Sequence, residues 1–177
     1  QIYLLSQFNT ASLHHHIQSA YKFDSFGGGF VDILSAEQTE TGGNWYQGTA
    51  DAVRQNLMHF GAQEDDLFLI LSGDQLYRMD FREIVRHHNE TGSEVTIAST
   101  PVSTMLAPDF GLMRIEDDYS IAEFVEKPQE ESIIQSLTLS KKLMHDLGKS
   151  NDSEYCLASM GIYLFRAGCL INALESE

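Results

Sequence analysis

Positive charge is scarce in this sequence. Its 177 residues include 11 Lys and Arg against 26 Asp and Glu, which gives a net charge of −15 at pH 7. A surface this negative repels phosphate backbones, because affinity for nucleic acids comes mainly from cationic neutralisation. DNA, RNA and anionic membranes are therefore poor candidate partners. Any phosphate ligand needs a local device, such as a helix N-terminus, a few placed cations or a metal ion.

Cysteine and long apolar runs are scarce as well. Cys156 and Cys169 lack the His or Cys spacing of a zinc site. We expect two reduced thiols, and a disulfide between them is the alternative that the sequence leaves open. The apolar runs, such as residues 67–71, are far shorter than a membrane span. No charged and then apolar leader is visible, so the sequence gives no argument for secretion and we expect a cytoplasmic protein.

Short apolar segments that alternate with helical patterns dominate what is present. The first half predicts strands at 2–5, 30–36, 67–71 and 94–100, with helices at 10–22, 49–60 and 80–90. Pro101 is expected to close the fourth of these strands. The second half predicts strands at 110–116, 120–127 and 157–165 and a loose helix near 131–147. The order indicates one α/β domain with a mainly parallel sheet and an antiparallel element.

The stretch NWYQGTADAVRQ (44–55) combines a helix start with a possible ligand site. Thr49 is placed to cap the helix at 49–60, and the helix is expected to turn a stripe of four residues to the core: Ala50, Val53, Leu57 and Phe60. A helix start does not explain the four residues before it. An aromatic ring, a hydroxyl, an amide and a bare backbone suit a sugar or base pocket, and they are supplied by Trp45, Tyr46, Gln47 and Gly48.

Asp74, in LSGDQLYRMD, follows the most apolar strand. Ligands of open α/β sheets bind outside the carboxyl ends of strands, and Gly73 allows a ligand to approach the backbone closely. A capping role competes with this interpretation. Because the next helix is expected to begin near Asp80, a metal or hydroxyl ligand is favoured over a cap, and a carboxylate suits Mg²⁺.

Three other motifs have ordinary explanations. Gly27–Gly29 precedes a strand, which favours a flexible connection over a phosphate loop. His14–His16 and the pair His87–His88 are adjacent on helices, so neither group converges on one ion. Glu126-Lys127-Pro128 is a common end to a strand, yet beside the other strand ends Lys127 is the obvious cation for a phosphate.

Six stretches in this order resemble the catalytic domain of ADP-glucose pyrophosphorylase (glucose-1-phosphate adenylyltransferase). They span nearly the whole chain and read QFNTASLHHHI, NWYQGTADAVRQ, LSGDQLYRMDF, FGLMRIEDD, EFVEKP and LASMGIYLF. The resemblance implies a Rossmann-like nucleotidyltransferase domain with a mainly parallel mixed sheet, which the chain 1–177 covers in part. The family's glycine-rich phosphate loop and N-terminal strand would lie before Gln1. Its second metal-binding aspartate and its left-handed β-helix would lie beyond Glu177.

The resemblance also implies substrates, a cofactor and residue roles. ATP and glucose 1-phosphate would react, with Asp74 holding a catalytic Mg²⁺ and Lys127 contacting the sugar phosphate. Glu126 would contact the sugar, and the sugar-phosphate pocket would be lined by Tyr46, Gly111 and Ser159. The nucleotide would lie near Gln47, Gly48, Thr49 and Gly73. The full-length enzyme would be a homo- or hetero-tetramer of the cytoplasm, or of the plastid in a plant.

Three alternatives remain at this point. The same chemistry with UTP or dTTP is disfavoured by the GTADA match, and a non-catalytic regulatory subunit is disfavoured by the presence of both Asp74 and Lys127. A metal-dependent glycosyltransferase would prefer Asp-x-Asp where this chain has Gly-Asp-Gln. Because the phosphate loop would lie outside these 177 residues, we expect the chain alone not to turn over ADP-glucose.

Overall fold

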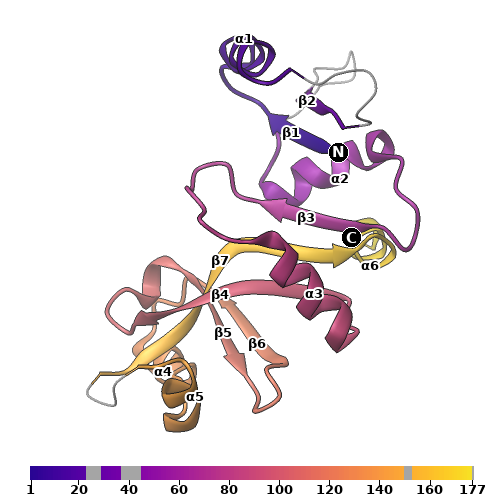
Figure 1. Ribbon diagram of the computed structural model, residues 1–177. Helices are drawn as coiled ribbons and strands as arrows, with labels where there is room; N and C mark the ends of the chain where they lie inside the picture. Colours follow the sequence, from indigo (N-terminus) through magenta and orange to yellow (C-terminus); the bar gives the residue numbers. More distant parts are fainter. Residues whose placement is uncertain (23–28, 37–44, 150–152, 177) are drawn as a thin grey trace. The chain divides into compact units, whose positions relative to one another are not determined.

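The computed structural model describes residues 1–22, 29–36, 45–149 and 153–176 (Figure 1). The chain forms two compact units, one made of Gln1–Glu64 and Leu170–Glu177 and one made of Asp65–Cys169. Helices and strands alternate over the first half of the chain and are mixed over the second half, which confirms the predicted α/β class. Within the described residues, no helix has both the length and the apolar character needed to cross a bilayer.

The first unit is built on a short parallel sheet. Its elements are β1 (Ile2–Ser6), α1 (Thr10–Ala20), β2 (Val31–Ser35) and α2 (Thr49–Phe60). The strands pair in parallel from Ile2 opposite Val31 to Ser6 opposite Ser35. The ring of Tyr3 lies 4.9 Å from that of Phe60, centroid to centroid, so β1 packs on the end of α2. His14–His16 are exposed on α1, as expected.

Two details of α2 differ from the sequence prediction. Thr49 is the first helical residue and not the cap; Gly48 takes the cap position with φ of 150° and ψ of −178°, a conformation that favours glycine. Val53 and Phe60 are buried as predicted, but Ala50 is exposed. The buried face is rotated toward Ala52 and Asn56, since hydrogen bonding lets Asn56 occupy an inward position that an apolar pattern does not reveal.

The second unit holds a five-stranded sheet with helices beside it. Its elements are β3 (Leu67–Leu71), α3 (Phe81–Thr91), β4 (Val95–Ser103), the 3₁₀ turn η1 (Ala107–Asp109), β5 (Gly111–Ile115), β6 (Ile121–Glu126), α4 (Glu131–Ser136), α5 (Lys141–Asp146) and β7 (Tyr155–Arg166). A last helix, α6 (Ala167–Glu175), follows β7 directly. The loose helix predicted near 131–147 is thus two short helices.

The long strand β7 organises this sheet. Its residues 162–165 pair on one edge with β3 and on the other edge with β4, both antiparallel. β5 is also antiparallel to β7, and β6 is antiparallel to β5. Consequently β3, β4 and β5 all run in one direction, and β6 and β7 run against them. Every pair of neighbouring strands in this sheet is therefore antiparallel, because β7 runs between β3, β4 and β5 in the opposite direction. The predicted mainly parallel sheet is wrong for the second unit; among the described strands only β1 and β2 pair in parallel.

Pro101 does not end β4, contrary to expectation. The strand continues to Ser103, with Pro101 opposite Leu157 of β7. Among the described strands β4 pairs only with β7, so it is an edge strand. An edge strand tolerates proline because no neighbour requires the missing N–H.

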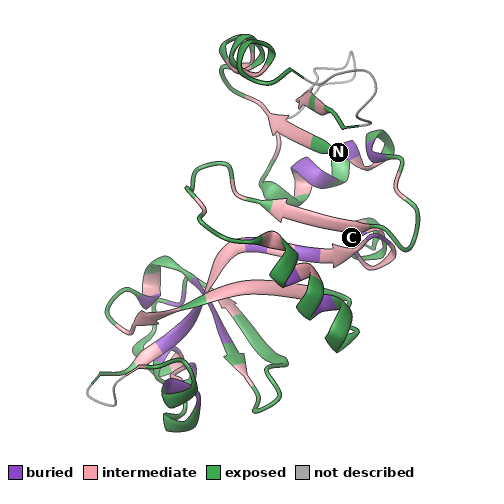
Figure 2. Ribbon diagram, in the orientation of Figure 1, coloured by how far each residue is buried: buried purple, intermediate pink, exposed green. Residues whose placement is uncertain are grey.

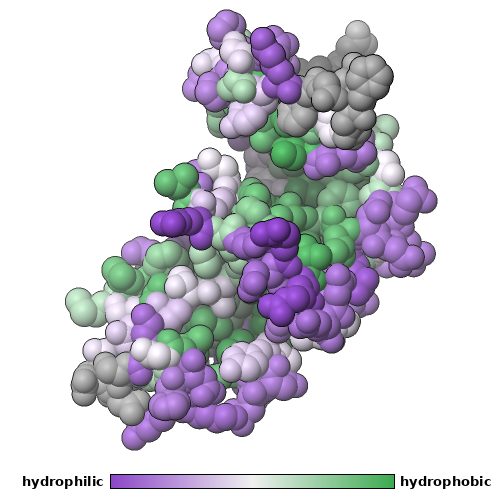
Figure 3. All heavy atoms as spheres, viewed as in Figure 1, coloured by the Kyte–Doolittle hydropathy of each residue, from purple (hydrophilic) through white to green (hydrophobic). Residues whose placement is uncertain are grey.

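Helix α3 begins where the sequence predicts. Asp80 caps it by accepting a hydrogen bond from the backbone N–H of Arg82, and Gly92 ends it with a φ of 64°. Its outer face is strongly hydrophilic (Figure 3). Its inner face buries Ile84 against Ile162 and Leu164 of β7.

Buried residues concentrate on β5 and β7 (Figure 2). A second cluster surrounds Cys156, whose thiol lies 3.7 Å from the carbonyl oxygen of Ile134. Burial raises the pKa of Cys156 and of Cys169. Both cysteines are free thiols, Cys156 buried and Cys169 half-buried, with no disulfide between them.

Candidate functional site

The candidate site of the second unit lies where two strands meet end to end on one edge of β7. β3 pairs with residues 162–166 and β5 with residues 157–158, both on the edge that faces away from β4. The carboxyl end of β3 and the amino end of β5 therefore meet beside residues 159–161. We call Ser159–Gly161 the β7 junction.

An irregularity in β7 marks this junction. Ala98 of β4 pairs with Ile162, but the next residue, Ser99, pairs with Ser159. Met160 and Gly161 are thus extra residues with no partner in β4. Gly161 has a φ of 68°, which an L-amino acid with a side chain rarely adopts. Such a bulge re-aims the backbone at the point where the β3–α3 loop arrives.

The loop after β3 carries Asp74 and lies against the junction. A Cβ placed on Gly161 would stand 3.5 Å from Cβ of Ser72 and 3.8 Å from Nε2 of Gln75. The Ser72 hydroxyl donates to Oδ1 of Asp74 at 2.6 Å, and the carboxylate is exposed. Asp74 does not cap a helix, since α3 is capped by Asp80 six residues later. The predicted absence of a capping role is confirmed, and that the carboxylate binds a ligand stays a prediction.

Gly111 begins β5 opposite Glu126 and has no room for a side chain. A Cβ on Gly111 would stand 2.7 Å from Oε2 of Glu126 and 2.7 Å from Cζ of Phe124. The bare backbone of Gly111 therefore lets the Glu126 carboxylate lie directly over it. Continuing the β5–β7 register by one residue sets Gly111 beside Ser159.

Lys127 continues this row of residues beyond β6. Its backbone N–H donates to the carbonyl oxygen of Phe110 at 3.0 Å, and its φ is 46°. A left-handed residue at this point turns the chain sharply after Glu126. The exposed ammonium lies 3.7 Å from Oε1 of Glu126. Both charged groups are solvent-accessible, so the ion pair is weak and leaves the lysine available.

Ser159 is held within the bulge by two contacts. Its hydroxyl oxygen lies 3.2 Å from the hydroxyl of Tyr163 and accepts a hydrogen bond from the backbone N–H of Gly161 at 3.2 Å. The half-buried side chain is thus fixed at the junction. The structure brings together the segments of six predicted site residues: Gly73, Asp74, Gly111, Glu126, Lys127 and Ser159.

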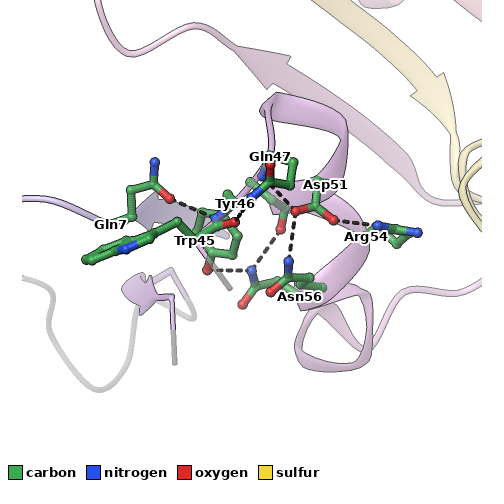
Figure 4. Close-up of polar contacts among 9 residues, drawn as sticks. Gln7, Trp45, Tyr46, Gln47, Asp51, Arg54 and Asn56 are labelled. Atoms are coloured by element: carbon green, nitrogen blue, oxygen red, sulfur yellow. Dashed lines mark hydrogen bonds and ion pairs between the residues drawn. The ribbon is translucent and has the colours of Figure 1, made fainter. Parts of the chain in front are cut away.

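The remaining predicted residues belong to the first unit, where they form a polar network (Figure 4). The backbone N–H of Tyr46 donates to Oε1 of Gln7 at 2.8 Å, and Asn56 donates to the Tyr46 hydroxyl at 2.9 Å. Asp51 accepts from the backbone N–H of Gln47 at 2.8 Å, which fixes the entry to α2. That Tyr46, Gln47, Gly48 and Thr49 share a cleft with Asp74 stays a prediction.

Asp51 is a structural carboxylate of this network. It also accepts hydrogen bonds from Gln55 and Arg54. The Arg54 guanidinium, followed by the N–H of Gln47, holds the pKa of Asp51 below its ordinary value. Trp45 stacks on Phe8 with ring centroids 5.1 Å apart, and both rings are more than half exposed. The two rings offer a flat surface to solvent.

The described residues fit a magnesium ion only in part. Asp74 is one exposed carboxylate, and nowhere in the described ranges do three His, Cys, Asp or Glu residues gather as a metal cluster. Mg²⁺ commonly takes one or two carboxylates and completes its shell with water and substrate phosphates. Asp74 supplies one carboxylate, the minimum of this range.

Two residues that support the site escaped the sequence prediction. Tyr77 donates its hydroxyl to the carbonyl oxygen of Ser72 at 2.7 Å, and Gly161 makes the bulge possible. A glycine inside an apolar strand pattern is a known signal of a bulge, so the role of Gly161 could have been predicted from the sequence. The bond of Tyr77 had no signal, because it joins the phenol to a main-chain atom five residues away.

Comparison with known proteins identifies the family. The sequence model of the nucleotidyl transferase family matches residues 1–177, so this chain belongs to the nucleotidyl transferase family. Its fold is similar to that in the crystal structure of HddC from Yersinia pseudotuberculosis, with a TM-score of 0.61 and 15% sequence identity. The match covers 97% of this chain and 58% of that chain. This chain thus spans less than two thirds of that neighbour, and the likeness supports the fold alone.

Proposed function

We propose that this domain transfers an adenylyl group from ATP to glucose 1-phosphate, giving ADP-glucose and pyrophosphate. Family membership supports nucleotidyl transfer. The observation that carries the finer proposal is the β7 junction, where one sheet edge gathers the segments of Asp74, Gly111, Glu126 and Ser159. These are positions at which the chain resembles ADP-glucose pyrophosphorylases.

The row of residues from Ser159 to Lys127 suits a sugar phosphate. Glu126 presents a carboxylate over the bare backbone of Gly111, an arrangement that accepts hydrogen bonds from sugar hydroxyls. Lys127 supplies an exposed ammonium for the phosphate next to that carboxylate. Ser159 adds a fixed hydroxyl at the other end of the row.

The reaction needs placement more than acid–base chemistry. A phosphate oxygen of glucose 1-phosphate is already anionic, so it attacks the α-phosphorus of ATP without a general base. The new P–O bond forms as the bond between the α-phosphorus and the bridging oxygen breaks, and pyrophosphate leaves. Lys127 would hold the attacking phosphate in position, which lowers the entropic part of the barrier.

Asp74 would hold Mg²⁺ in this proposal, together with phosphate oxygens of the substrates. The ion would neutralise charge on the phosphates as the reaction proceeds. The exposure of Asp74 supports this role, and so does its hydrogen bonding: among the described residues only Ser72 donates to the carboxylate, through Oδ1, which leaves Oδ2 to bind.

The first unit would contribute to the nucleotide. Gly48, in its extended conformation with positive φ, exposes main chain at the start of α2, beside Gln47 and Thr49. Tyr46 has its hydroxyl engaged by Asn56, so its ring would serve as a packing surface. The resemblance to ADP-glucose pyrophosphorylases also supports a proposal about the full-length protein. It would act in glycogen or starch synthesis, as an effector-regulated tetramer of the cytoplasm or plastid.

The test measures pyrophosphate release by the full-length protein in Mg²⁺, with ATP, UTP, dTTP and other nucleoside triphosphates against several sugar 1-phosphates. The expected result is the highest kcat/KM for ATP with glucose 1-phosphate, and ADP-glucose as the product. A preference for UTP or dTTP would overturn the nucleotide assignment. Absence of turnover with every pair, in a folded protein, would support the non-catalytic subunit instead.

A further inference from the structure

The loop from Ser72 to Asp80 is exposed over most of its length but anchored at one residue. Gly73, Asp74, Gln75 and Leu76 are exposed, with Leu76 fully so. Tyr77 is half-buried and packs against the cluster of Ile84, Ile162 and Leu164. Its ring also meets that of Phe81 edge-on, with centroids 6.5 Å apart. The ring is therefore fixed by α3 and β7, which are regular elements.

The hydroxyl of this anchored ring is hydrogen-bonded to the start of the loop. It donates to the carbonyl oxygen of Ser72 at 2.7 Å, and the hydroxyl of the same serine donates to Asp74 at 2.6 Å. Two short hydrogen bonds thus connect a residue of the core to the exposed carboxylate. Ser72 also lies against Gly161, whose missing side chain leaves room for the turn.

We propose that Tyr77 is a positioning residue: its hydroxyl sets the Ser72–Asp74 turn and thereby aims the Asp74 carboxylate. This inference rests on the proposed function, since that function gives the carboxylate a ligand to meet. Groups that orient a metal-binding carboxylate influence metal affinity strongly although they never touch the ion. Tyr77 contributes no atom to the reaction.

The perturbation is Tyr77→Phe in the full-length protein, because it removes one oxygen and keeps the ring in the core. We expect the Mg²⁺ concentration for half-maximal rate to rise about tenfold, the range typical of such supporting groups. The KM for glucose 1-phosphate should stay unchanged. Mn²⁺ affinity, measured by electron paramagnetic resonance with ATP present, should fall by a similar factor, and this second readout does not depend on turnover.

The matched control is Tyr155→Phe, which removes a phenol at the other end of β7, where the ring lies under Lys149. It should leave both readouts unchanged. Ser72→Ala is the second variant, since it breaks the next bond of the same chain and should weaken metal affinity in the same direction. Combining Tyr77→Phe with Asp74→Asn should add no further loss of Mn²⁺ affinity, because both changes act on one carboxylate.

Distinct outcomes separate this inference from the proposed function. Wild-type metal affinity in Tyr77→Phe, or equal losses in Tyr77→Phe and Tyr155→Phe, would overturn the positioning role. An additive effect on top of Asp74→Asn would also overturn it, since Tyr77 would then act elsewhere. Absence of wild-type turnover with every substrate pair counts against the proposed function alone, and the Mn²⁺ titration still decides the role of Tyr77.

Discussion

The substitution Gly111→Ala tests whether the Glu126 carboxylate must lie over a bare backbone. The added methyl would stand 2.7 Å from Glu126 and 2.7 Å from the Phe124 ring. Non-bonded carbon atoms prefer about 3.5–4.0 Å, so both side chains must retreat by roughly 1 Å. Each has somewhere to go, since Phe124 is 41% exposed and the Glu126 side chain is more exposed still.

The expected cost in stability is therefore small. Overpacking typically costs about 1–3 kcal/mol, and movable surface groups place this site at the lower end. Loss of glycine's freedom in the unfolded chain offsets part of that, by about 0.4–1 kcal/mol. A net loss of about 1 kcal/mol corresponds to a decrease in Tm of about 2–4 °C for a chain of this size.

The expected cost in activity is much larger. A misplacement of about 1 Å in a positioning group reduces rates by about 100-fold. Gly111→Ala should therefore lower kcat/KM for glucose 1-phosphate about 100-fold while Tm changes little. Near-normal kcat/KM with the expected decrease in Tm would refute the role of Glu126 at this position.

Two further variants locate the effect. Gly111→Ala combined with Phe124→Ala should regain stability, because the ring is gone, without regaining activity, because Glu126 is still displaced. Recovery of activity would instead assign the effect to Phe124. Gly73→Ala is the control for stability only, since no atom lies within 4 Å of its added Cβ.

Three other predictions follow from the same structure. Asp74→Asn should lower kcat about 100-fold or more with an unchanged Tm, because the carboxylate is exposed; near-normal turnover in Mg²⁺ would exclude the metal role. Lys127→Ala should raise the KM for glucose 1-phosphate more than that for ATP in initial-rate measurements, and an equal effect on both would remove its assignment to the sugar phosphate. Burial, with the nearby charge of Arg166, lowers the pKa of His88. Its contribution to stability is thus complete above about pH 6.5, its unfolded pKa, and is lost as the pH falls toward the lower folded value, by at most about 1.4 kcal/mol per pH unit. Urea titrations from pH 7.5 to 5 should show this slope in the wild type and lose it in His88→Gln; an unchanged slope would assign the acid sensitivity to other groups.

Local signals sufficed for much of the fold. The bounds of β3 agree with its apolar run, and α3 begins beside Asp80, where the helix was predicted to start, because both depend on neighbours in sequence. Pro101 and Thr49 were misassigned for a shared reason. A proline ends a strand only where a neighbouring strand would need the N–H that proline lacks. Thr49 caps the helix only if Gly48 before it does not take the cap position. Both outcomes depend on the surrounding structure.

His88 shows the same limit for single residues. The sequence predicted only that His87 and His88 do not bind one ion together, and it gave no burial for either; His87 is exposed. His88 is fully buried, with Nδ1 2.8 Å from the hydroxyl of Thr96 on β4 and Nε2 without a hydrogen-bond partner among the described residues. Helical periodicity around Ile84 places position 88 on the inner face, but residue type alone outweighs that signal.

The candidate site was predictable to the extent that it depends on strand ends. Asp74 became a candidate because it follows the most apolar strand, and that inference needs no tertiary information. The β7 junction was not predictable, since it depends on β3 and β5 pairing with different segments of the same edge. The sequence does not reveal the register between β5 and β7. A register shifted by one residue would be compatible with the same sequence pattern, yet it would separate Gly111 from Ser159.

The pattern of ion pairs explains how a chain of net charge −15 can handle phosphates. Four of the six arginines, Arg54, Arg82, Arg86 and Arg114, pair with carboxylates close to them in sequence or in the same hairpin. The positive charge of these arginines is neutralised by the neighbouring carboxylates, so it does not create a broad positive surface. Lys127 also has a carboxylate partner, but at 3.7 Å and in solvent, where an ion pair contributes at most about 1 kcal/mol. Under the proposed function, an arriving phosphate would displace Glu126 at little cost, and Glu126 would then turn to the sugar. The weak pair would be a resting arrangement from which both side chains reach one substrate.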